Sequence, residues 1–324
     1  MPRLAVVLNG YGMDHWEKGG GHRDLLGWDD LRGLARLAED LGFQAIFVPE
    51  IRGREVFSTL AGFAGETDRI RLASGVVPLR ARDLSTLGMA ASSVDEMSGG
   101  RFVLGVGSQA GIDRTHQTLR VIRAVVEGSE GILSGPDSPG STDQLDWHVN
   151  PRRIPIFLAA LGPRMVDLAG RAADGVLLNW CTPERVVAAR KAIPRREGFT
   201  VAVYVRACLA HVDDAAAAAL KVAAARYLHL GHYARQFEAM GLGAEVRAAH
   251  EALQGDRSPE EAVPDRVVEA TCVFGDRESA LDRLGEYAEA GADLVAVYPV
   301  PAREAVSSIS GTMMAVAPNP AVEA

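Results

Sequence analysis

Residues 98–111 read SGGRFVLGVGSQAG, a short apolar run from Phe102 to Val106 with glycines on both sides. Such a run is typical of a buried β-strand, and glycines beside it allow tight turns or close approach to a ligand. The spacing is not that of a dinucleotide-binding loop. Gly105, Gly107 and Gly111 place the third glycine one position later than G-x-G-x-x-G requires. Three strand-like runs precede this one, so the pattern around it decides the fold.

Eight apolar runs along the chain are predicted as strands, and most are continuous, as expected for parallel strands buried on both faces. They are Leu4–Leu8, Ala45–Val48, Ile70–Ser74, Phe102–Val106, Ile156–Ala160, Val176–Leu178, Val201–Arg206 and Leu294–Tyr298. Amphipathic helical segments separate them. In WDDLRGLARLAEDLGF (residues 28–43), leucines and alanines form one stripe and Gly42 follows the last of them. This alternation predicts an α/β fold, a (β/α)8 TIM barrel, with a doubly wound open sheet as the alternative.

Two segments interrupt the alternation. Residues 131–153 are rich in Gly, Pro, Ser and Asp and predict an irregular excursion. Residues 213–270 have an almost wholly helical pattern and lie between the seventh and eighth strands. This segment is too long to be a single crossover helix. We therefore expect one domain over residues 1–324, with a helical insertion at 213–270.

Composition narrows the classes of partner and compartment. The formal net charge of −8 argues against nucleic acid as the main partner, because phosphate neutralisation needs a basic face. Cys181, Cys208 and Cys272 stand far apart without metal or C-x-x-C spacing, which predicts buried reduced thiols in a cytoplasmic protein. The five-residue apolar run near the N-terminus is too short for a signal peptide, and no run approaches a membrane span.

In a barrel, ligands bind where the strands end, so the residues after each strand are the candidate site. These positions hold glycines, small polar groups and few charges, and no His, Asp or Glu cluster has metal spacing. They lack the paired carboxylates of glycosidases and any Ser-His-Asp order. The pattern predicts a pocket for a large organic ligand, with a cofactor supplying the chemistry and no metal.

Two sequence features favour an anionic ligand. Gly162-Pro163 starts a helix after a strand, and the LGVGSQ turn (residues 104–109) offers further backbone donors; together they could hold one phosphate. Arg52, Arg54, Arg80 and Arg82 follow the second and third strands. The alternatives are a turn that only starts a helix and a solvated loop surface.

Five stretches together resemble the luciferase-like flavin oxidoreductase superfamily: LARLAEDLGFQAIFVPE, AGETDRIRLASGVVPL, SSVDEMSGGRFVLGVGS, PIFLAALGPRMVDLAGRAADGVLL and ALDRLGEYAEAGADLVAVYP. The resemblance implies a TIM barrel that binds FMN or the deazaflavin F420, and a homodimer packed through early helices. It implies a bulge at Gly75–Val76, with a non-proline cis bond, behind the cofactor ring. The implied cofactor-binding residues are Gly75, Val76, Gly105, Val106, Gly107, Ser108, Gln109, Ala160, Leu161, Gly162, Pro163 and Asn179.

LGPRM, LAGRAADGVLL and RYLHLGHYARQFEAMG are most similar to the deazaflavin branch that includes methylene-tetrahydromethanopterin reductase. In that branch the rim arginines would meet the anionic cofactor tail. Ile51 stands where many FMN monooxygenases of the superfamily have histidine, and the segment after Ser108 is shorter than the family's pattern. The leading prediction is F420-dependent hydride transfer to or from a small organic substrate.

Glu50 is the candidate catalytic acid or base, and its alternative role is to anchor an arginine. The rival functions are an FMN-dependent monooxygenase fed by a partner reductase, a non-catalytic flavin-binding relative and a cofactor-free barrel isomerase. The isomerase fits least, because the strand ends lack paired acid and base groups.

Overall fold

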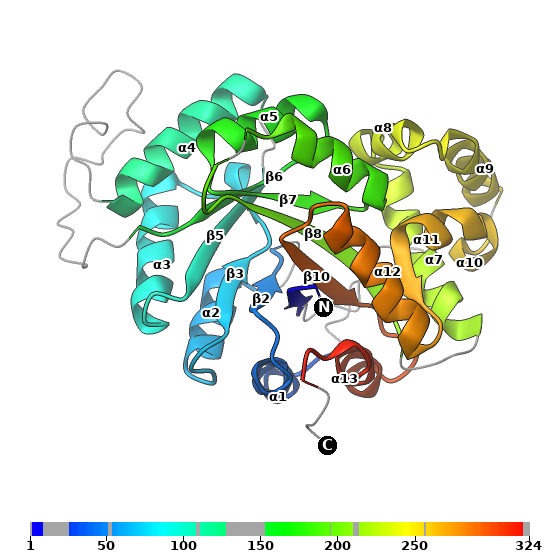
Figure 1. Ribbon diagram of the computed structural model, residues 1–324, viewed down its shortest axis with the longest axis horizontal. Helices are drawn as coiled ribbons and strands as arrows, with labels where there is room; N and C mark the ends of the chain where they lie inside the picture. The colour runs from blue at the N-terminus through cyan, green and yellow to red at the C-terminus, as the bar shows by residue number, and fades with distance from the viewer. Residues whose placement is uncertain are drawn as a thin grey trace.

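A computed structural model describes residues 2–8, 26–50, 54–107, 111–127, 153–194, 196–209, 214–255 and 257–319. Over these residues, eight parallel strands form a ring (Figure 1). They are β1 (Leu4–Val7), β2 (Ala45–Val48), β3 (Arg71–Ser74), β5 (Phe102–Gly107), β6 (Ile156–Ala159), β7 (Gly175–Asn179), β8 (Thr200–Cys208) and β10 (Leu294–Pro299). All eight predicted strands are present, each within two residues of its predicted bounds.

The ring is closed because β10 pairs with both β1 and β8. Ala296 is the partner of Ala5 on one side and of Tyr204 on the other, and both pairings are parallel. The predicted (β/α)8 barrel is therefore confirmed, and the open-sheet alternative is wrong. Because the strands are parallel and joined by helices, their carboxyl ends share one end of the barrel.

Helices surround the ring and bury one face each against the strands (Figure 1). They are α1 (Trp28–Asp40), α2 (Val56–Ala64), α3 (Leu84–Met97), α4 (Ile112–Glu127), α5 (Pro163–Ala172), α6 (Pro183–Ala192), α12 (Arg277–Glu289) and α13 (Ala305–Val316). The predicted stripe of α1 is buried, and Gly42 takes the left-handed conformation that ends the helix, with φ +82°. Gly291 repeats this device after α12, with φ +103°.

Two short strands were not predicted. β4 (Val77–Pro78) pairs with the end of β5, and η1 (Leu79–Ala81), a single 3₁₀ turn, follows it. β9 (Cys272–Phe274) pairs with Arg206, Ala207 and Cys208, so β8 extends two residues beyond its predicted end. Both strands are too short to show a hydrophobic period of their own.

Five helices lie between β8 and β9: α7 (Asp214–Leu228), α8 (Gly231–Ala239), α9 (Gly243–Gln254), α10 (Pro259–Ala262) and α11 (Asp265–Thr271). They gather on one side of the barrel, with α8 and α9 away from the strands (Figure 1). Their apolar faces form a core of their own around Leu220, Ala224, Phe237 and Val267. Trp180 and Cys208, at the ends of β7 and β8, belong to this core, so the helices pack onto the carboxyl ends of those two strands.

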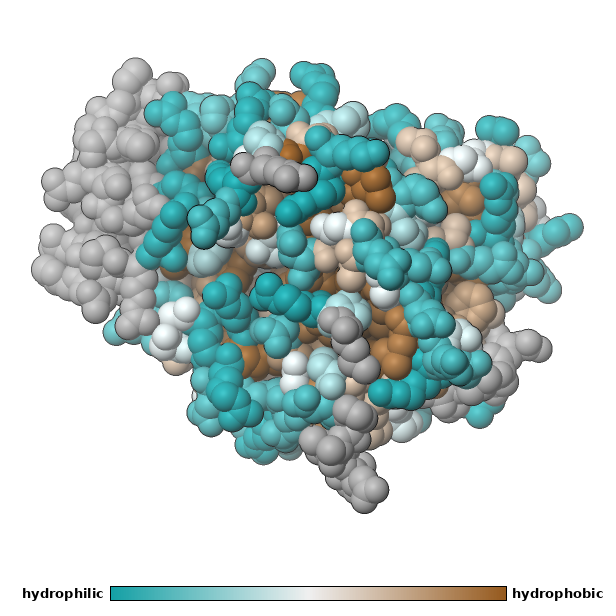
Figure 2. Space-filling model, in the orientation of Figure 1, coloured by the Kyte–Doolittle hydropathy of each residue, from teal (hydrophilic) through white to brown (hydrophobic). Residues whose placement is uncertain are grey.

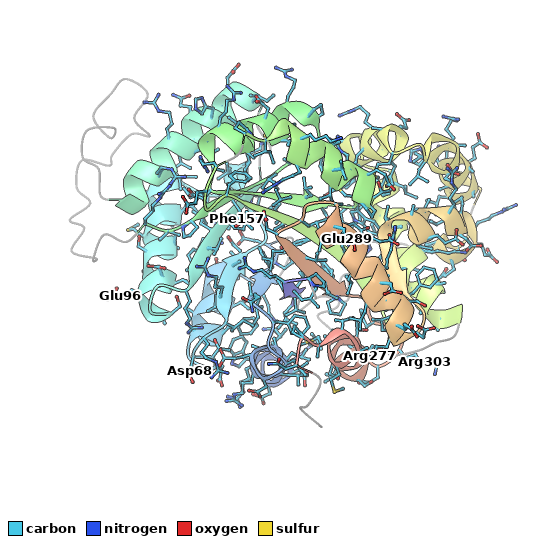
Figure 3. The ribbon with its side chains drawn as sticks, viewed as in Figure 1. Asp68, Glu96, Phe157, Arg277, Glu289 and Arg303 are labelled. Carbon is cyan, nitrogen blue, oxygen red and sulfur yellow. The ribbon has the colours of Figure 1, made fainter. Side chains whose placement is uncertain are left out.

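The barrel interior is filled by a mixture of small, aliphatic and aromatic residues. The interior cluster comprises Ala5, Val7, Ala45, Phe47, Ala73, Val103, Phe157, Leu177, Ala202, Tyr204, Leu294, Ala296 and Tyr298. Figure 3 shows Phe157 within the ring of strands, whereas Asp68 and Glu96 lie at the periphery.

The face of the molecule seen in Figure 2 is mostly hydrophilic, with hydrophobic side chains visible between the charged ones. In the described part of the chain, no helix is both long enough and apolar enough to cross a membrane.

Candidate functional site

The described members of the predicted site all lie at the carboxyl ends of neighbouring strands. Gly75 and Val76 lie between β3 and β4, and Gly105, Val106 and Gly107 belong to β5. Ala160, Leu161, Gly162 and Pro163 connect β6 to α5, Asn179 ends β7, and Glu50 follows β2. Ser108 and Gln109 lie outside the described residues. The barrel therefore brings together predicted residues that are up to 129 positions apart along the chain.

Gly75 and Val76 form a bulge that is hydrogen-bonded on several sides. The Gly75 N–H donates to the Val48 carbonyl at 2.7 Å, and the Glu50 N–H donates to the Val76 carbonyl at 3.4 Å. From the opposite side of the barrel, the Tyr204 hydroxyl donates to the Gly75 carbonyl at 3.0 Å. The Gly75–Val76 peptide bond is cis, in agreement with the expectation from the resemblance.

The glycines around this bulge are explained by packing. A Cβ on Gly75 would lie 1.8 Å from the Tyr204 hydroxyl oxygen, and one on Gly105 would lie 2.0 Å from the Ser74 carbonyl oxygen. A Cβ on Gly107 would lie 2.7 Å from a methyl carbon of Val76. The glycine-rich end of β5 therefore lets the bulge lie directly against the strand, and Val76 covers it toward the barrel mouth.

The β6–α5 connection presents free backbone donors. Gly162 is the N-cap of α5 and Pro163 is its first residue. Among the described residues, the N–H groups of Leu161, Gly162 and Arg164 have no hydrogen-bond acceptor. A Cβ built on Gly162 meets nothing within 4 Å, so space is open beside these donors. A helix start of this kind attracts an anion.

Val106 and Ala160 offer the site only their backbone, because both side chains are buried in the layer between strands and helices. The side chain of Arg185 donates to the Leu161 carbonyl at 2.6 Å and thereby braces the β6–α5 connection.

Asn179 is held in a polar network that joins the barrel to α7 and α8. Its side-chain oxygen accepts a hydrogen bond from Arg206, and its amide donates to the Tyr233 hydroxyl at 2.6 Å. The Gln236 amide donates to the carbonyls of Asn179 and Trp180, both at 2.6 Å. Trp180 adopts the left-handed conformation, with φ +51°, which is uncommon for a bulky residue. The α8 helix thus fixes the turn after β7.

Arg206 lies at the centre of this network and is only 2% exposed. Its guanidinium carbon lies 4.3 Å from the ring centre of Trp180, 4.7 Å from that of Tyr298 and 5.1 Å from that of Tyr227. It also donates to the Tyr227 hydroxyl at 3.2 Å. Such cation–π contacts compensate part of the cost of burying a guanidinium.

Glu50 is paired with Arg82 across the neighbouring strand end. Two guanidinium nitrogens of Arg82 donate to the two carboxylate oxygens of Glu50, one of them at 3.1 Å, and Arg82 also contacts Glu55. The hydrogen bond from Arg82 to Glu50, despite partial burial, and the charges of Glu50 and Glu55 raise the pKa of Arg82. A two-pronged ion pair commits both carboxylate oxygens of Glu50 to Arg82, so the contacts favour the anchoring role. A catalytic role for Glu50 stays a prediction.

Among the described residues, the arginines that follow β2 and β3 do not come together as an anion-binding site. Arg82 is engaged by two carboxylates, and Arg54 donates to the Leu26 carbonyl at 2.9 Å. Arg80 is exposed, and Arg52 lies outside the described residues, as does Ile51.

Tyr204 and Arg206 are the site residues that sequence reasoning missed. Both occupy inward positions of β8, where the strand pattern alternates between interior and exterior faces. The signal was present: an arginine stands inside an otherwise apolar run. Tyr227 on α7 and Tyr233 on α8 are partly buried and place their hydroxyls in the Arg206 network.

Other chemistry finds little support in the described chain. Within it, no group of three or more His, Cys, Asp or Glu side chains is placed to hold a metal ion. The three cysteines are buried and form no disulfide with one another, in agreement with the prediction of reduced thiols, and burial raises the pKa of Cys181 to about 12.

Comparison with known proteins agrees with this geometry. A family model for the luciferase-like monooxygenases matches residues 12–294. The 5,10-methylenetetrahydromethanopterin reductase of Archaeoglobus fulgidus is 27% identical over 301 residues, covering 84% of this chain and 90% of that protein.

Two solved structures share the fold over nearly the whole chain. The coenzyme F420 dependent tetrahydromethanopterin reductase from Methanopyrus kandleri has a TM-score of 0.74 at 20% identity, and the match covers 99% of both chains. The oxygenating constituent of 3,6-diketocamphane monooxygenase from Pseudomonas putida, in complex with FMN, has a TM-score of 0.65 at 14% identity and the same coverage. The chain therefore belongs to the luciferase-like monooxygenase family of oxidoreductases.

Proposed function

We propose that this protein is an F420-dependent oxidoreductase that transfers a hydride to or from a small organic substrate. The observation that carries the proposal is the cradle that the bulge after β3, the glycines of β5 and the β6–α5 connection form at the carboxyl ends of β3, β5 and β6. There, glycines and small residues replace side chains, and the start of α5 leaves backbone donors without acceptors. Similarity to a putative coenzyme F420-dependent oxidoreductase of Mycobacterium tuberculosis, 26% identical over 308 residues and 82% of this chain, supports this choice of cofactor.

The residues present fit such a cofactor. Leu161, Gly162 and Arg164 would hold an anionic group of its tail through their N–H groups, beside the open space at Gly162. The bulge at Gly75 and Val76 would support one face of the ring, since Val76 lies over the end of β5. A bound deazaflavin supplies the hydride donor or acceptor.

The chain's own residues would exclude water and fix orientation. Phe47, Tyr204 and Tyr298 pack edge to face beneath the mouth, and the Tyr204 hydroxyl is committed to the Gly75 carbonyl. Burial raises the pKa of Tyr204 well above its usual value, so its hydroxyl stays protonated and keeps donating. We therefore assign Tyr204 a positioning role toward the bulge.

FMN-dependent oxygenation is the second candidate, because a structural neighbour of the same fold holds FMN. In that case a separate reductase would be a partner. A non-catalytic flavin-binding relative is the third. The homodimer remains a prediction, and the exposed Met89 and Met97 on α3 are consistent with contact through an early helix.

Gly162→Asp tests the cradle without threatening the fold. Aspartate is a preferred N-cap residue, and Gly162 already has the extended N-cap conformation, so folding should be unimpaired or slightly improved. Its carboxylate would stand where the anionic tail is proposed to bind, and like charges in close contact are strongly unfavourable. We expect F420 affinity, measured by fluorescence titration, to fall by about tenfold or more.

Two comparisons make this experiment specific. Gly285→Asp adds the same charge on α12, at a position where a Cβ also meets nothing, and should leave F420 affinity unchanged. The deazaflavin chromophore without its tail should bind the wild type and Gly162→Asp equally. Unchanged F420 binding in a folded Gly162→Asp protein would refute the proposed cradle.

A further inference from the structure

Hydrogen-bond donors around Arg206 outnumber the acceptors that the described residues offer. A guanidinium carries five N–H groups. Only two bonds engage those of Arg206, one to the Asn179 side chain and one to the Tyr227 hydroxyl. The remaining three N–H groups have no acceptor within hydrogen-bonding distance in the described chain. The indole N–H of Trp180, whose ring stacks on the same guanidinium, is also buried without an acceptor.

The cluster also lacks a counter-charge. Among the described residues no carboxylate lies within 4.0 Å of Arg206, whereas Arg82 is paired with carboxylates and Arg54 and Arg185 donate to carbonyls. Among the described residues of this cluster, the side-chain oxygen of Gln236 is a buried acceptor without a donor. Buried polar groups and charges are almost always satisfied, so the buried indole N–H of Trp180 and the incompletely bonded, positively charged guanidinium of Arg206 call for an acceptor-only group.

The cluster borders the proposed cofactor cradle. Asn179 ends β7, next to the β6–α5 connection, and it is the register partner of Tyr204 on β8. Arg206 pairs in register with Tyr298 on β10, and both side chains lie at the mouth of the barrel. A molecule lying between the cradle and β8 would reach Arg206 with one end.

We propose that Arg206, with the indole N–H of Trp180, binds an anionic oxygen group of a small molecule in the barrel mouth. An ionised carboxylate fits, because it only accepts hydrogen bonds and matches the planar fork of a guanidinium. This inference rests on the proposed function for its placement and names the substrate class: organic acids rather than neutral compounds. The same chemistry could come from the anionic tail of the cofactor, and the experiment separates the two.

The test compares isosteric pairs of charged and neutral probes. Benzoate against benzamide, and acetate against acetamide, are titrated into the protein with and without added F420 and followed by ligand-observed NMR. A hydrogen bond to a charged group contributes about 1.5–3 kcal/mol, so the wild type should prefer the carboxylates by about 10- to 100-fold. Equal binding of acid and amide in both pairs overturns the proposal.

Variants assign the preference to Arg206. Arg206→Met removes the charge at similar length and should abolish the preference, whereas Arg206→Lys should keep part of it. Arg283→Met is the matched control, because Arg283 lies over the Tyr287 ring, outside the barrel mouth. A carboxylate preference that survives unchanged in Arg206→Met overturns the proposal. If Arg206→Met does not fold, as judged by circular dichroism, the ratio of acid to amide affinity in the wild type and in Arg206→Lys still tests the proposal.

The source of the anion is separated by the cofactor itself. If Arg206→Met weakens F420 but not its tail-free chromophore, the anion belongs to the cofactor tail. If F420 affinity is unchanged while the benzoate preference is lost, the anion belongs to the substrate. A wild type that prefers benzoate but does not bind F420 supports the anion site and refutes the proposed function.

Discussion

At the scale of single residues, the glycines of this barrel are dictated by atoms far away in the sequence. Gly75, Gly105 and Gly107 could be flagged from the sequence as glycines near a strand end. The reason why each position needs glycine could not be predicted, because the atoms that lie at their Cβ positions belong to Tyr204, Ser74 and Val76. Contacts between residues 129 positions apart leave no local pattern for sequence reasoning to detect.

This account predicts a specific rescue at Gly75. Gly75→Ala places a methyl group 1.8 Å from the Tyr204 hydroxyl oxygen, and overpacking of this kind destabilises by about 1–3 kcal/mol. Tyr204→Phe removes that oxygen and leaves the ring carbon at 3.1 Å, so the double variant should recover part of the loss. Urea unfolding of the wild type, the two single variants and the double variant measures the coupling energy between the two positions. Strictly additive effects on the free energy of unfolding would contradict the predicted rescue. Gly285→Ala, with nothing near its Cβ, is the control.

At the scale of secondary structure, all eight barrel strands could be predicted because each is an apolar run between helical segments. The sequence did not reveal β4 and β9, which are two and three residues long and exist only through pairing with β5 and β8. The predicted strand Val201–Arg206 ended at Arg206. The strand continues to Cys208 because β9 pairs with those last three residues and the rings of Trp180, Tyr227 and Tyr298 surround the guanidinium.

Asp174 joins three elements at the amino ends of the strands, and its contacts predict how stability depends on pH. Its carboxylate accepts hydrogen bonds from the Ile156 N–H at 2.9 Å and from Arg123 and Arg153, both at 2.8 Å. Burial alone would raise the pKa of Asp174, but these bonds and charges outweigh it and hold the pKa below its usual value. The stabilisation is therefore complete above the unfolded pKa of about 4 and is lost as pH falls through the folded value.

Asp174→Asn should therefore lower the free energy of unfolding by about 1–3 kcal/mol at pH 7. The difference from wild type should shrink as the pH is lowered below about 4, since the wild-type carboxylate is then protonated. Urea unfolding at several pH values measures it. Asp167→Asn, which removes an exposed pair with Arg171, should change stability by less than about 0.5 kcal/mol. A wild-type advantage that persists undiminished in acid would contradict the assignment.

At the scale of the whole molecule, a barrel and a helical segment cooperate to build one site. The barrel supplies the cradle on β3, β5 and β6, and helices α7 and α8 supply Tyr227, Tyr233 and Gln236 to the opposite rim. Alternation of strands and helices was enough to predict the barrel, and the placement of the site at the carboxyl ends of its strands stays a prediction. Which side chains of the inserted helices reach the mouth depends on their packing on β7 and β8, which the sequence pattern does not encode.

The central claim is that the cradle binds a deazaflavin rather than FMN. The most direct measurement is a pair of fluorescence titrations of the purified protein, one with F420 and one with FMN, under the same conditions. Our account predicts saturable quenching by F420 in the micromolar range and a much weaker response to FMN. Tight binding of FMN without binding of F420 would contradict it and identify the protein as an FMN-dependent member of the family.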